Sequence, residues 1–230
     1  YFLHLTVSSS KPIVMVGAQR PYTSISSDAQ LNLFHAVKVA ADPGSQNKGV
    51  LVVFNNKIHS AREVTKVDTY NVDGFDSGDM GCLGYIDAAH DVVYYRSPVR
   101  KHTTVSVFSQ LEVTDFPKIE IVYSYAGADG DVIDYITDSG KYAGIVIAGT
   151  GAGRFSKKEE KAIARAIQHG LRVARSSRVG SGRVLPIEPF EHLDLIHADN
   201  LNPQKARILL ALAILQENEK DAIQQKFDEY

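Results

Sequence analysis

Short apolar runs that alternate with helical segments are the feature of this 230-residue chain that most restricts its fold. Residues 12–17 and 49–54 are short apolar runs that we expect to form buried strands, and residues 31–41 between them have the spacing of a helix. A strand–helix–strand order is typical of a parallel α/β layer and not of a β-sandwich. We expect the buried side of the helix to consist of Leu31, Phe34, His35 and Val39.

The same order returns after Pro117. Residues 119–123, 144–148 and 171–174 are predicted strands, and residues 129–139 are a predicted helix. The second part of the chain therefore also has the pattern of an α/β layer.

Two further helix starts are marked by capping residues. Ser156 and Glu159 have the spacing of a capping box, and Asn202 precedes a proline at the first helical position. The second of these helices contains residues 208–215, which are apolar on all sides, so we expect it to be buried.

Residues 97–117 lack a clean period and contain prolines, so we expect them to link two domains, residues 1–96 and 118–230. Residues 1–7 are apolar and have no N-cap in front of them, which indicates that the chain begins inside an element. The predicted fold class is α/β, with two doubly wound domains of which the first is incomplete at its N-terminus.

The composition disfavours several classes of function. With 25 Lys and Arg against 27 Asp and Glu, the formal net charge is −2, so no basic excess is available for a nucleic-acid backbone. Cys82 is the single cysteine, which excludes an internal disulfide and a cysteine-based zinc site. The longest apolar run is far shorter than the ~18 residues of a membrane span.

A glycine-rich loop at residues 149–153 lies between a predicted strand and a capped helix, where open α/β sheets bind ligands. The dinucleotide-binding fingerprint fails because its sixth position is Arg154. We therefore expect a ligand-facing loop of another kind.

Lys66 ends the segment Ala-Arg-Glu-Val-Thr-Lys. A partly desolvated lysine beside an acid can act as a general base. Val64, Lys66 and Asp68 are also alternate residues of an exposed strand, in which a solvated lysine is the ordinary case. The pattern alone leaves both interpretations open.

The charged residues elsewhere suggest no metal site. His192 and His197 are five positions apart, without the helical pattern of a metal-binding motif.

Arg175 and Arg178 could bind an anion, but two charges at a strand end are more typical of a solvated or salt-bridged edge.

Seven segments, taken in order along the chain, resemble the bacterial-type L-asparaginase family, in particular its type II tetrameric enzymes. They are residues 14–21, 49–53, 62–66, 100–103, 147–153, 175–179 and 201–207. The resemblance implies a two-domain α/β protein that hydrolyses L-asparagine to L-aspartate and ammonia, with L-glutamine as a side substrate. It further implies a homotetramer built as a dimer of intimate dimers, and neither a metal nor an organic cofactor. The resemblance to type II enzymes favours a periplasmic or secreted location over a cytoplasmic one.

Four residues match functional positions of the family. Lys66 matches a catalytic lysine that works with a threonine and an aspartate, and Ala18 matches a residue that lines the substrate pocket through its backbone. Glu188 matches the acid that meets the α-amino group of the substrate. Arg154 stands where the family usually has Asn or Ser, so we expect the pocket wall to differ here.

The family's nucleophilic threonine lies in a Gly-Gly-Thr motif, and its second threonine lies in Gly-Thr-Asp-Thr. Both precede the position that matches Tyr1, and neither motif occurs in the 230 residues. The resemblance therefore implies that about the first third of a family chain is missing, and that these residues alone are inactive.

Two alternatives stay open at this point. The first is a catalytically dead asparaginase-like interaction module that keeps the second domain and the dimer surface. The second is the tRNA-dependent amidotransferase subunit that shares this fold, which the near-neutral charge disfavours.

Overall fold

The computed structural model describes residues 1–112 and 115–230, which divide into two compact units, Tyr1–Leu111 and Glu112–Tyr230. Residues 97–111, expected as part of a linker, are included in the first unit, and residues 113–114 of that linker lie outside the described residues. The division of the sequence into residues 1–96, 97–117 and 118–230 stays a prediction.

The first unit contains a five-stranded sheet with the strand order β1-β2-β3-β6-β7. Strands β1 and β2 are parallel and joined through helix α2, and the remaining neighbours are antiparallel. The expected parallel layer is thus confirmed for the β1–α2–β2 part, while the sheet as a whole is mixed. Its elements are α1 (Phe2–Thr6), β1 (Ile13–Val16), α2 (Ala29–Ala41), β2 (Val50–Phe54), β3 (Lys57–Ser60), β4 (Thr65–Lys66), β5 (Phe75–Asp76), β6 (Gly84–Ile86) and β7 (Val92–Tyr94), with short 3-10 helices η1 (Pro43–Ser45), η2 (Gly78–Met80), η3 (Thr103–Val105) and η4 (Val107–Gln110).

A two-residue turn explains why the sheet changes direction after β2. Asn55 and Asn56 both have positive φ angles, 45° and 63°, and they join Phe54 to its antiparallel partner Lys57. Asparagine tolerates this left-handed backbone better than most residues, and tight hairpins require it at both central positions.

Residues 12–17 contain a strand, as predicted, but the prediction that this strand is buried is wrong. Strand β1 lies at an edge of the sheet, with Met15 48% and Val16 38% exposed. An edge strand has a neighbour on one side only, so its apolar side chains are less covered than those of β2.

The expected buried side of α2 is confirmed for His35 and Val39 and is wrong for Leu31 and Phe34. Leu31 and Phe34 are 45% and 48% exposed, and the buried face consists of Asn32, His35, Ala36 and Val39. These four share one face by the i, i+3, i+4, i+7 rule, but Asn32 is polar, which is why hydrophobicity placed the face wrongly.

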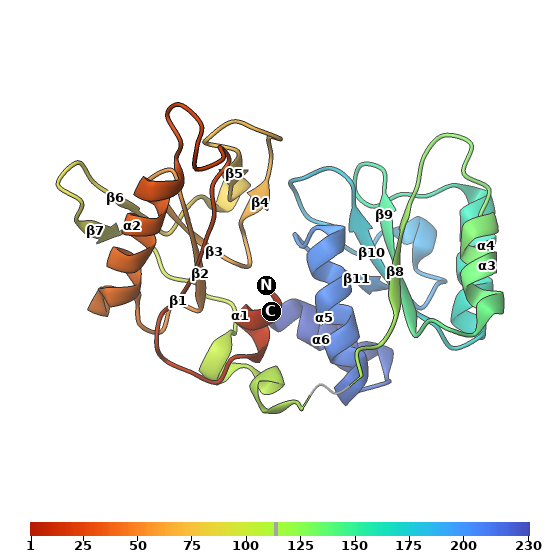
Figure 1. The fold of residues 1–230 in the computed structure, drawn as a ribbon. Coiled ribbons are helices and arrows are strands. Elements are labelled where there is room, and N and C mark those ends of the chain that lie inside the picture. Colours follow the sequence, from red (N-terminus) through yellow and green to blue (C-terminus); the bar gives the residue numbers. More distant parts are fainter. Residues whose placement is uncertain (113–114) are drawn as a thin grey trace. The chain divides into compact units, whose positions relative to one another are not determined.

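The second unit is a four-stranded parallel sheet with the order β11-β10-β9-β8. Figure 1 shows α3 and α4 on one side of this sheet and α5 and α6 on the other, as expected for a doubly wound layer. Its elements are β8 (Ile119–Tyr123), α3 (Asp131–Ser139), β9 (Gly144–Gly149), α4 (Lys157–Gln168), β10 (Arg172–Ser177), the 3-10 helix η5 (Glu188–Phe190), β11 (Ile196–His197), α5 (Pro203–Gln216) and α6 (Lys220–Glu229).

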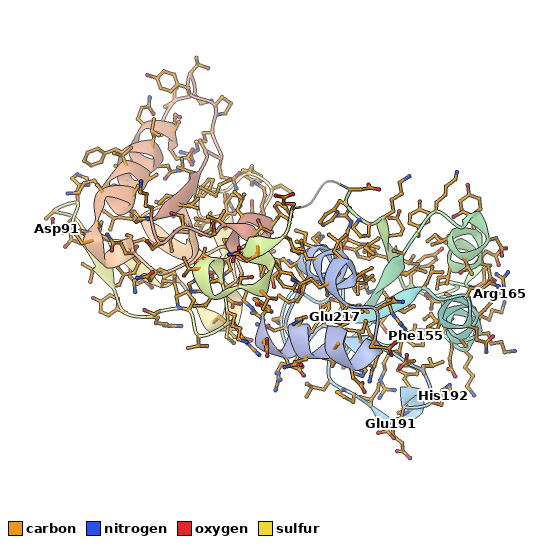
Figure 2. All side chains as sticks on the ribbon, turned by 90° about the horizontal axis from the view of Figure 1, so that it is seen from below. Asp91, Phe155, Arg165, Glu191, His192 and Glu217 are labelled. Atoms are coloured by element: carbon orange, nitrogen blue, oxygen red, sulfur yellow. The ribbon has the colours of Figure 1, made fainter. Side chains whose placement is uncertain are left out.

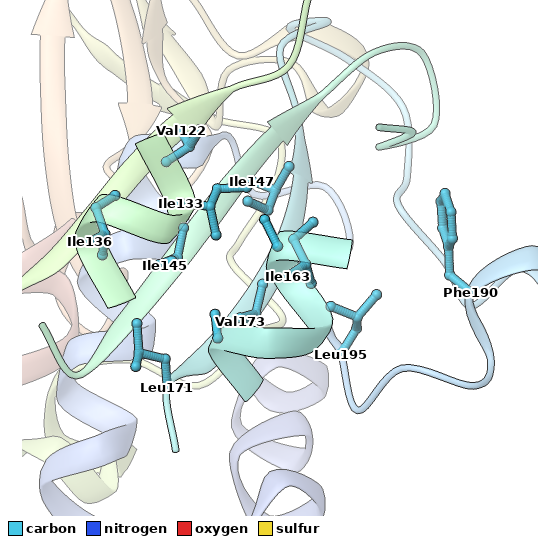
Figure 3. Close-up of a cluster of buried hydrophobic side chains, with 12 residues drawn as sticks. Val122, Ile133, Ile136, Ile145, Ile147, Ile163, Leu171, Val173, Phe190 and Leu195 are labelled. Atoms are coloured by element: carbon cyan, nitrogen blue, oxygen red, sulfur yellow. The ribbon is translucent and has the colours of Figure 1, made fainter. Parts of the chain in front are cut away.

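Branched aliphatic side chains form the core between this sheet and helices α3 and α4. Ile133 from α3, Ile145 and Ile147 from β9, and Ile163 from α4 are all fully buried (Figure 3). Each contributes about 1.5–3 kcal/mol through its burial. The strands and helices predicted from the sequence therefore also supply the side chains of this core.

The predicted caps are confirmed. The Ser156 hydroxyl accepts the Glu159 N–H at 3.2 Å while the Glu159 carboxylate accepts the Ser156 N–H at 2.8 Å. Asn202 accepts the Lys205 N–H at 3.0 Å and starts α5. The middle of α5 is buried as expected, whereas Leu215 near its end is 39% exposed.

Candidate active site

The four residues singled out in the sequence lie in two groups. Ala18 and Lys66 belong to the first unit, and Arg154 and Glu188 belong to the second.

Ala18 lies just beyond the carboxyl end of β1, where parallel sheets place ligand-binding segments. The Asp28 carboxylate, at the start of α2, accepts the N–H groups of Gln19 at 3.0 Å and Arg20 at 2.9 Å. The Asn32 amide donates to Asp28 at 2.9 Å and to the Gly17 carbonyl at 3.1 Å. The backbone on both sides of Ala18 is thereby fixed while Ala18 itself is exposed.

The charge of Asp28 is favoured by these bonds. Partial burial raises the pKa of its carboxyl, but the N–H groups of Gln19 and Arg20 outweigh burial, and the resulting pKa lies below its ordinary value. A charged Asp28 is a stronger acceptor, so it holds the Ala18 segment more firmly than a neutral one would.

Lys66, at the end of β4, is exposed and is held by two groups of the first unit. Its ammonium donates to Gln19 Oε1 and lies 5.1 Å from the centre of the Phe75 ring. Phe75 is in turn stacked on Phe54 of β2, with ring centres 4.2 Å apart. The lysine is therefore anchored to the sheet through an aromatic pair and to the Ala18 segment through Gln19.

The turn between β4 and β5 is shaped by Asp68 and Gly74. Asp68 accepts the N–H groups of Tyr70 and Asn71, both at 2.9 Å, and these bonds, that of Asn71 first, hold its pKa below the ordinary value. A Cβ on Gly74 would lie 2.3 Å from Gln19 Nε2, so glycine is required for the Gln19 carboxamide to pack against this turn.

In the described part of the chain, no carboxylate forms an ion pair with Lys66; its ammonium contacts a neutral amide and a ring face. An ammonium has three donors, and Gln19 takes one. The others remain available to an anionic or polarised group, as in electrostatic catalysis.

Arg154 ends a tight loop in the second unit. Thr150 and Arg154 exchange two backbone hydrogen bonds, each 2.8 Å long, and Gly151 and Gly153 between them have φ angles of 50° and 81°. The Arg154 side chain is exposed. The sequence prediction of a ligand-facing loop is compatible with this geometry and stays a prediction.

Glu188 opens the 3-10 helix η5 and is exposed. Phe190, two residues later, is buried and stacks on Phe155, with ring centres 4.1 Å apart and an interplanar angle of 16°. Phe155 directly follows Arg154, so this stack joins the two segments that carry the predicted substrate residues. Beyond η5 the turn carries Glu191 and His192 outward (Figure 2).

The prediction that Arg175 belongs to a solvated or salt-bridged strand end is wrong. Its side chain on β10 is fully buried, and no ion pair involves it in residues 1–112 and 115–230. It donates to the Leu185 carbonyl and lies 3.4 Å from His197 Nδ1. Burial, with a smaller contribution from Arg154, lowers its pKa to about 10, so it stays charged at neutral pH.

Sequence reasoning missed Gln19 and Phe190 and misjudged Arg175, which it expected at a solvated or salt-bridged edge. Gln19 offered a signal, because it follows Ala18 directly. The contacts of Arg175 and Phe190 join segments that are far apart in the chain, and no periodicity reports such a meeting.

A cavity of about 330 Å³ lies beside this arrangement in the second unit. Leu185, Phe190, His197 and Asp228 are among its lining residues, whereas Arg154 and Glu188 are not. Within the described residues, no group of three or more His, Cys, Asp or Glu could hold a metal ion. A search of the same residues finds no helix long and apolar enough to cross a membrane.

Residues 1–100 match the family described as "Asparaginase, N-terminal", and residues 118–227 match "Glutaminase/Asparaginase C-terminal domain". A solved structure titled "Crystal Structure of Probable Cytoplasmic L-asparaginase from Campylobacter jejuni" superposes with a TM-score of 0.95 at 41% identity. The superposition covers 100% of this chain and 73% of that one.

Among curated relatives, the chain is 44% identical to L-asparaginase 2 of Bacillus subtilis (strain 168) and 44% identical to L-asparaginase 2 of Escherichia coli (strain K12). All of this chain is covered in both, but it spans only 60% and 66% of their lengths, less than two thirds. It is also 37% identical to a glutaminase-asparaginase of Acinetobacter glutaminasificans, of which it covers 70%. Both domain families are matched in order and the relatives align over the whole chain, so this chain belongs to the asparaginase family.

Proposed function

We propose that this chain supplies the lysine and the substrate-binding loops of an amidohydrolase that converts L-asparagine to L-aspartate and ammonia. The single observation that carries the proposal is the position of Lys66. It matches the family's catalytic lysine, and its ammonium is oriented by Gln19 next to the exposed Ala18 segment without an ion-pair partner among the described residues.

The chemistry requires negative charge to be stabilised. An oxygen nucleophile, a threonine in the resemblance, loses its proton and adds to the side-chain amide carbon of asparagine. The carbon–nitrogen bond then breaks, the nitrogen leaves as ammonia after gaining a proton, and water releases aspartate. The Lys66 ammonium favours the deprotonated groups in this sequence, because its free donors can face them.

Glu188 and Arg154 complement the two charges of an α-amino acid. In this proposal the Glu188 carboxylate pairs with the α-ammonium group, and the Arg154 guanidinium faces the α-carboxylate. The Phe155–Phe190 stack joins their segments, which supports a shared role. An arginine in place of a small polar residue also narrows the pocket, which favours the shorter side chain of asparagine over glutamine.

The names of the relatives support the same preference. The two relatives at 44% identity are named L-asparaginase 2, whereas those named glutaminase-asparaginase are 35% to 37% identical. We therefore propose L-asparagine as the main substrate and L-glutamine as a side substrate.

The resemblance places the nucleophilic threonine outside these 230 residues. The proposal is therefore tested by ammonia release from L-asparagine after the N-terminal segment of a family member, which carries that threonine, is added in trans, with L-glutamine measured in parallel. The Lys66→Ala variant should lose activity by about 10²–10⁴-fold. Lys11→Ala, which removes an exposed lysine elsewhere in the first unit, is the matched control and should retain activity. A parent chain that stays inactive with the added segment would instead favour the catalytically dead interaction module.

The proposed assembly is a homotetramer, a dimer of intimate dimers in which a neighbouring second domain closes each pocket. Light scattering coupled to size-exclusion chromatography should give four times the mass of one chain. A monomeric mass at micromolar concentration would contradict this assembly.

A further inference from the structure

Two separate segments of the second unit carry the proposed substrate residues. The loop of residues 150–154 ends at Arg154, and the turn of residues 185–190 contains Glu188. Both meet the same side chain, Arg175 of β10.

The contact with the first segment is made by the aliphatic part of Arg175. A Cβ on Gly153 would lie 3.1 Å from Arg175 Cγ and 2.8 Å from Val184 Cγ1, so the loop backbone lies directly on the arginine stem. Gly153 has a φ of 81°, which an L side chain rarely adopts. The loop is therefore held close to Arg175 by a residue that leaves no room for a side chain.

The contact with the second segment is made by the guanidinium. It donates to the Leu185 carbonyl through Nη2, and its central carbon lies 5.5 Å from the centre of the Phe190 ring. Phe190 is in turn stacked on Phe155, with ring centres 4.1 Å apart. Arg175, Phe190 and Phe155 thus form one continuous group, which we call the Arg175 stack.

The base of this group is rigid. Arg175 lies in β10 between two parallel neighbours, opposite Ile147 on β9 and His197 on β11. Its own carbonyl accepts the Ala198 N–H at 3.0 Å. The backbone of Arg175 is therefore held in place on both sides. A rigid element of this kind is needed to position site residues to within about 0.5 Å.

Burying the charged side chain of Arg175 lowers the stability of the fold, so filling space alone does not explain an arginine at this position. It is fully buried, and its Nε and Nη1 atoms have no hydrogen-bond partner in the described residues. A buried charge without an acid is destabilising, and an apolar side chain of similar volume is often neutral or better. An apolar side chain of similar volume, such as methionine, could neither donate to the Leu185 carbonyl nor place a cation against the Phe190 ring. These two contacts explain the arginine.

We propose that Arg175 is a positioning residue that fixes the Arg154 loop and the Glu188 turn relative to each other, so that they present one surface to the substrate. This inference rests on the proposed function for the identity of the substrate. The positioning itself is independent of it and is measured on the 230-residue chain.

The first measurement is backbone amide exchange in three variants. Arg175→Met keeps the stem and removes the charge and donors, Arg175→Lys keeps a cation and a donor, and Arg172→Met is the control on the same strand, whose ion pair with Asp194 is 3.8 Å long. In Arg175→Met we expect residues 150–155 and 185–190 to exchange about 10-fold faster or more while α3 is unchanged, with a smaller effect in Arg175→Lys.

Exchange that accelerates in only one of the two segments, or equally in α3, would overturn the inference. If Arg175→Met fails to fold, Phe190→Leu tests the same stack from its other member and should loosen the same two segments. The Arg172→Met control should leave both segments at the rates of the parent chain.

The second measurement is the kinetics of L-asparagine hydrolysis by the chain supplemented in trans with the N-terminal segment of a family member. Loss of positioning should raise KM by about 10-fold or more with a much smaller change in kcat, and Arg175→Lys should recover part of the affinity. An equal fall in kcat and kcat/KM would contradict a positioning role. If the parent chain with the added N-terminal segment does not hydrolyse L-asparagine, the proposed function fails, and the exchange comparison still decides the positioning.

Discussion

Lys66 donates a hydrogen bond to Gln19 Oε1, and this bond joins the end of β4 to the segment that follows β1. The two residues are 47 positions apart in the chain. Because Gln19 is next to Ala18, the same residue orients the ammonium and belongs to the segment whose backbone is proposed to line the pocket. The Lys66 ammonium and the pocket wall are therefore not independent parts.

With the N-terminal segment of a family member added in trans, replacing Gln19 by leucine should lower kcat for L-asparagine by about 10- to 100-fold, because a misplaced catalytic group reduces the rate even when its chemistry is intact. The chain should stay folded, because leucine fills a similar volume. The nitrogen–proton NMR signal of the Lys66 ammonium should shift or disappear in the variant. Gln204→Leu, at an exposed position of α5, is the control and should change neither kcat nor that signal.

The strands and helices of the second unit were predictable because each apolar run has the length and flanking residues of its element. The capping box of Ser156 and Glu159 is an example, since both partners lie three residues apart. The face of α2 was misjudged because the polar Asn32 is buried there to bond Asp28 and Gly17. A tertiary hydrogen-bond network leaves no trace in hydrophobic periodicity.

The candidate site shows the same division. Lys66, Ala18, Glu188 and Arg154 were found through resemblance to a family, and composition or spacing alone left Lys66 open between two interpretations. Gln19 and Arg175 act through contacts between distant segments, which only the folded chain brings together. The burial of Arg175 could not be expected either, because arginine is almost never fully buried unless it is paired.

Asp28→Ala should destabilise the first unit by about 1–3 kcal/mol, because it leaves the N–H groups of Gln19 and Arg20 and the Asn32 amide without their acceptor. Asp28→Asn keeps one acceptor oxygen and should cost less. Urea unfolding at pH 7 measures both. Equal stability of Asp28→Ala and the parent chain would show that the carboxylate does not hold the Ala18 segment.

His4 should make the first unit less stable in mild acid. Its Nδ1 accepts the Val50 N–H at 3.1 Å, and burial, followed by the influence of His102, lowers its pKa from 6.5 to about 3. Between these values the unfolded chain binds a proton that the folded chain does not, so the free energy of unfolding falls as the pH falls from about 6.5 towards 3. The slope for one such histidine approaches about 1.4 kcal/mol per pH unit.

Hydrogen exchange of the β2 amides at pH 4, 5, 6 and 7 measures this dependence. His4→Asn should have a shallower slope than the parent chain, whereas His169→Asn, at an exposed position of the second unit, should leave the slope unchanged. His59 is buried and has its pKa lowered to about 4, so part of the dependence should persist in His4→Asn. An unchanged slope in His4→Asn would contradict a neutral, buried His4.

Alanine substitutions at two glycines of one loop distinguish the cost of backbone strain from the cost of close packing. Gly151 and Gly153 both have positive φ angles, so alanine at either position carries a strain of about 1 kcal/mol or more. A Cβ on Gly151 meets nothing within 4 Å, whereas one on Gly153 lies 2.8 Å from Val184 Cγ1 and 3.0 Å from the Ser176 carbonyl oxygen. Gly153→Ala should therefore destabilise the second unit by about 1–3 kcal/mol more than Gly151→Ala.

Urea unfolding of the two variants measures that difference, and amide exchange locates it. Gly153→Ala should also loosen residues 185–190, because the added methyl group pushes against Val184 and the Arg175 stem, both of which support the Glu188 turn. Gly151→Ala should leave that turn at the exchange rates of the parent chain. If both variants lose the same stability and neither affects the turn, the close packing of this loop on Arg175 contributes nothing, and the two substrate-binding segments are held independently.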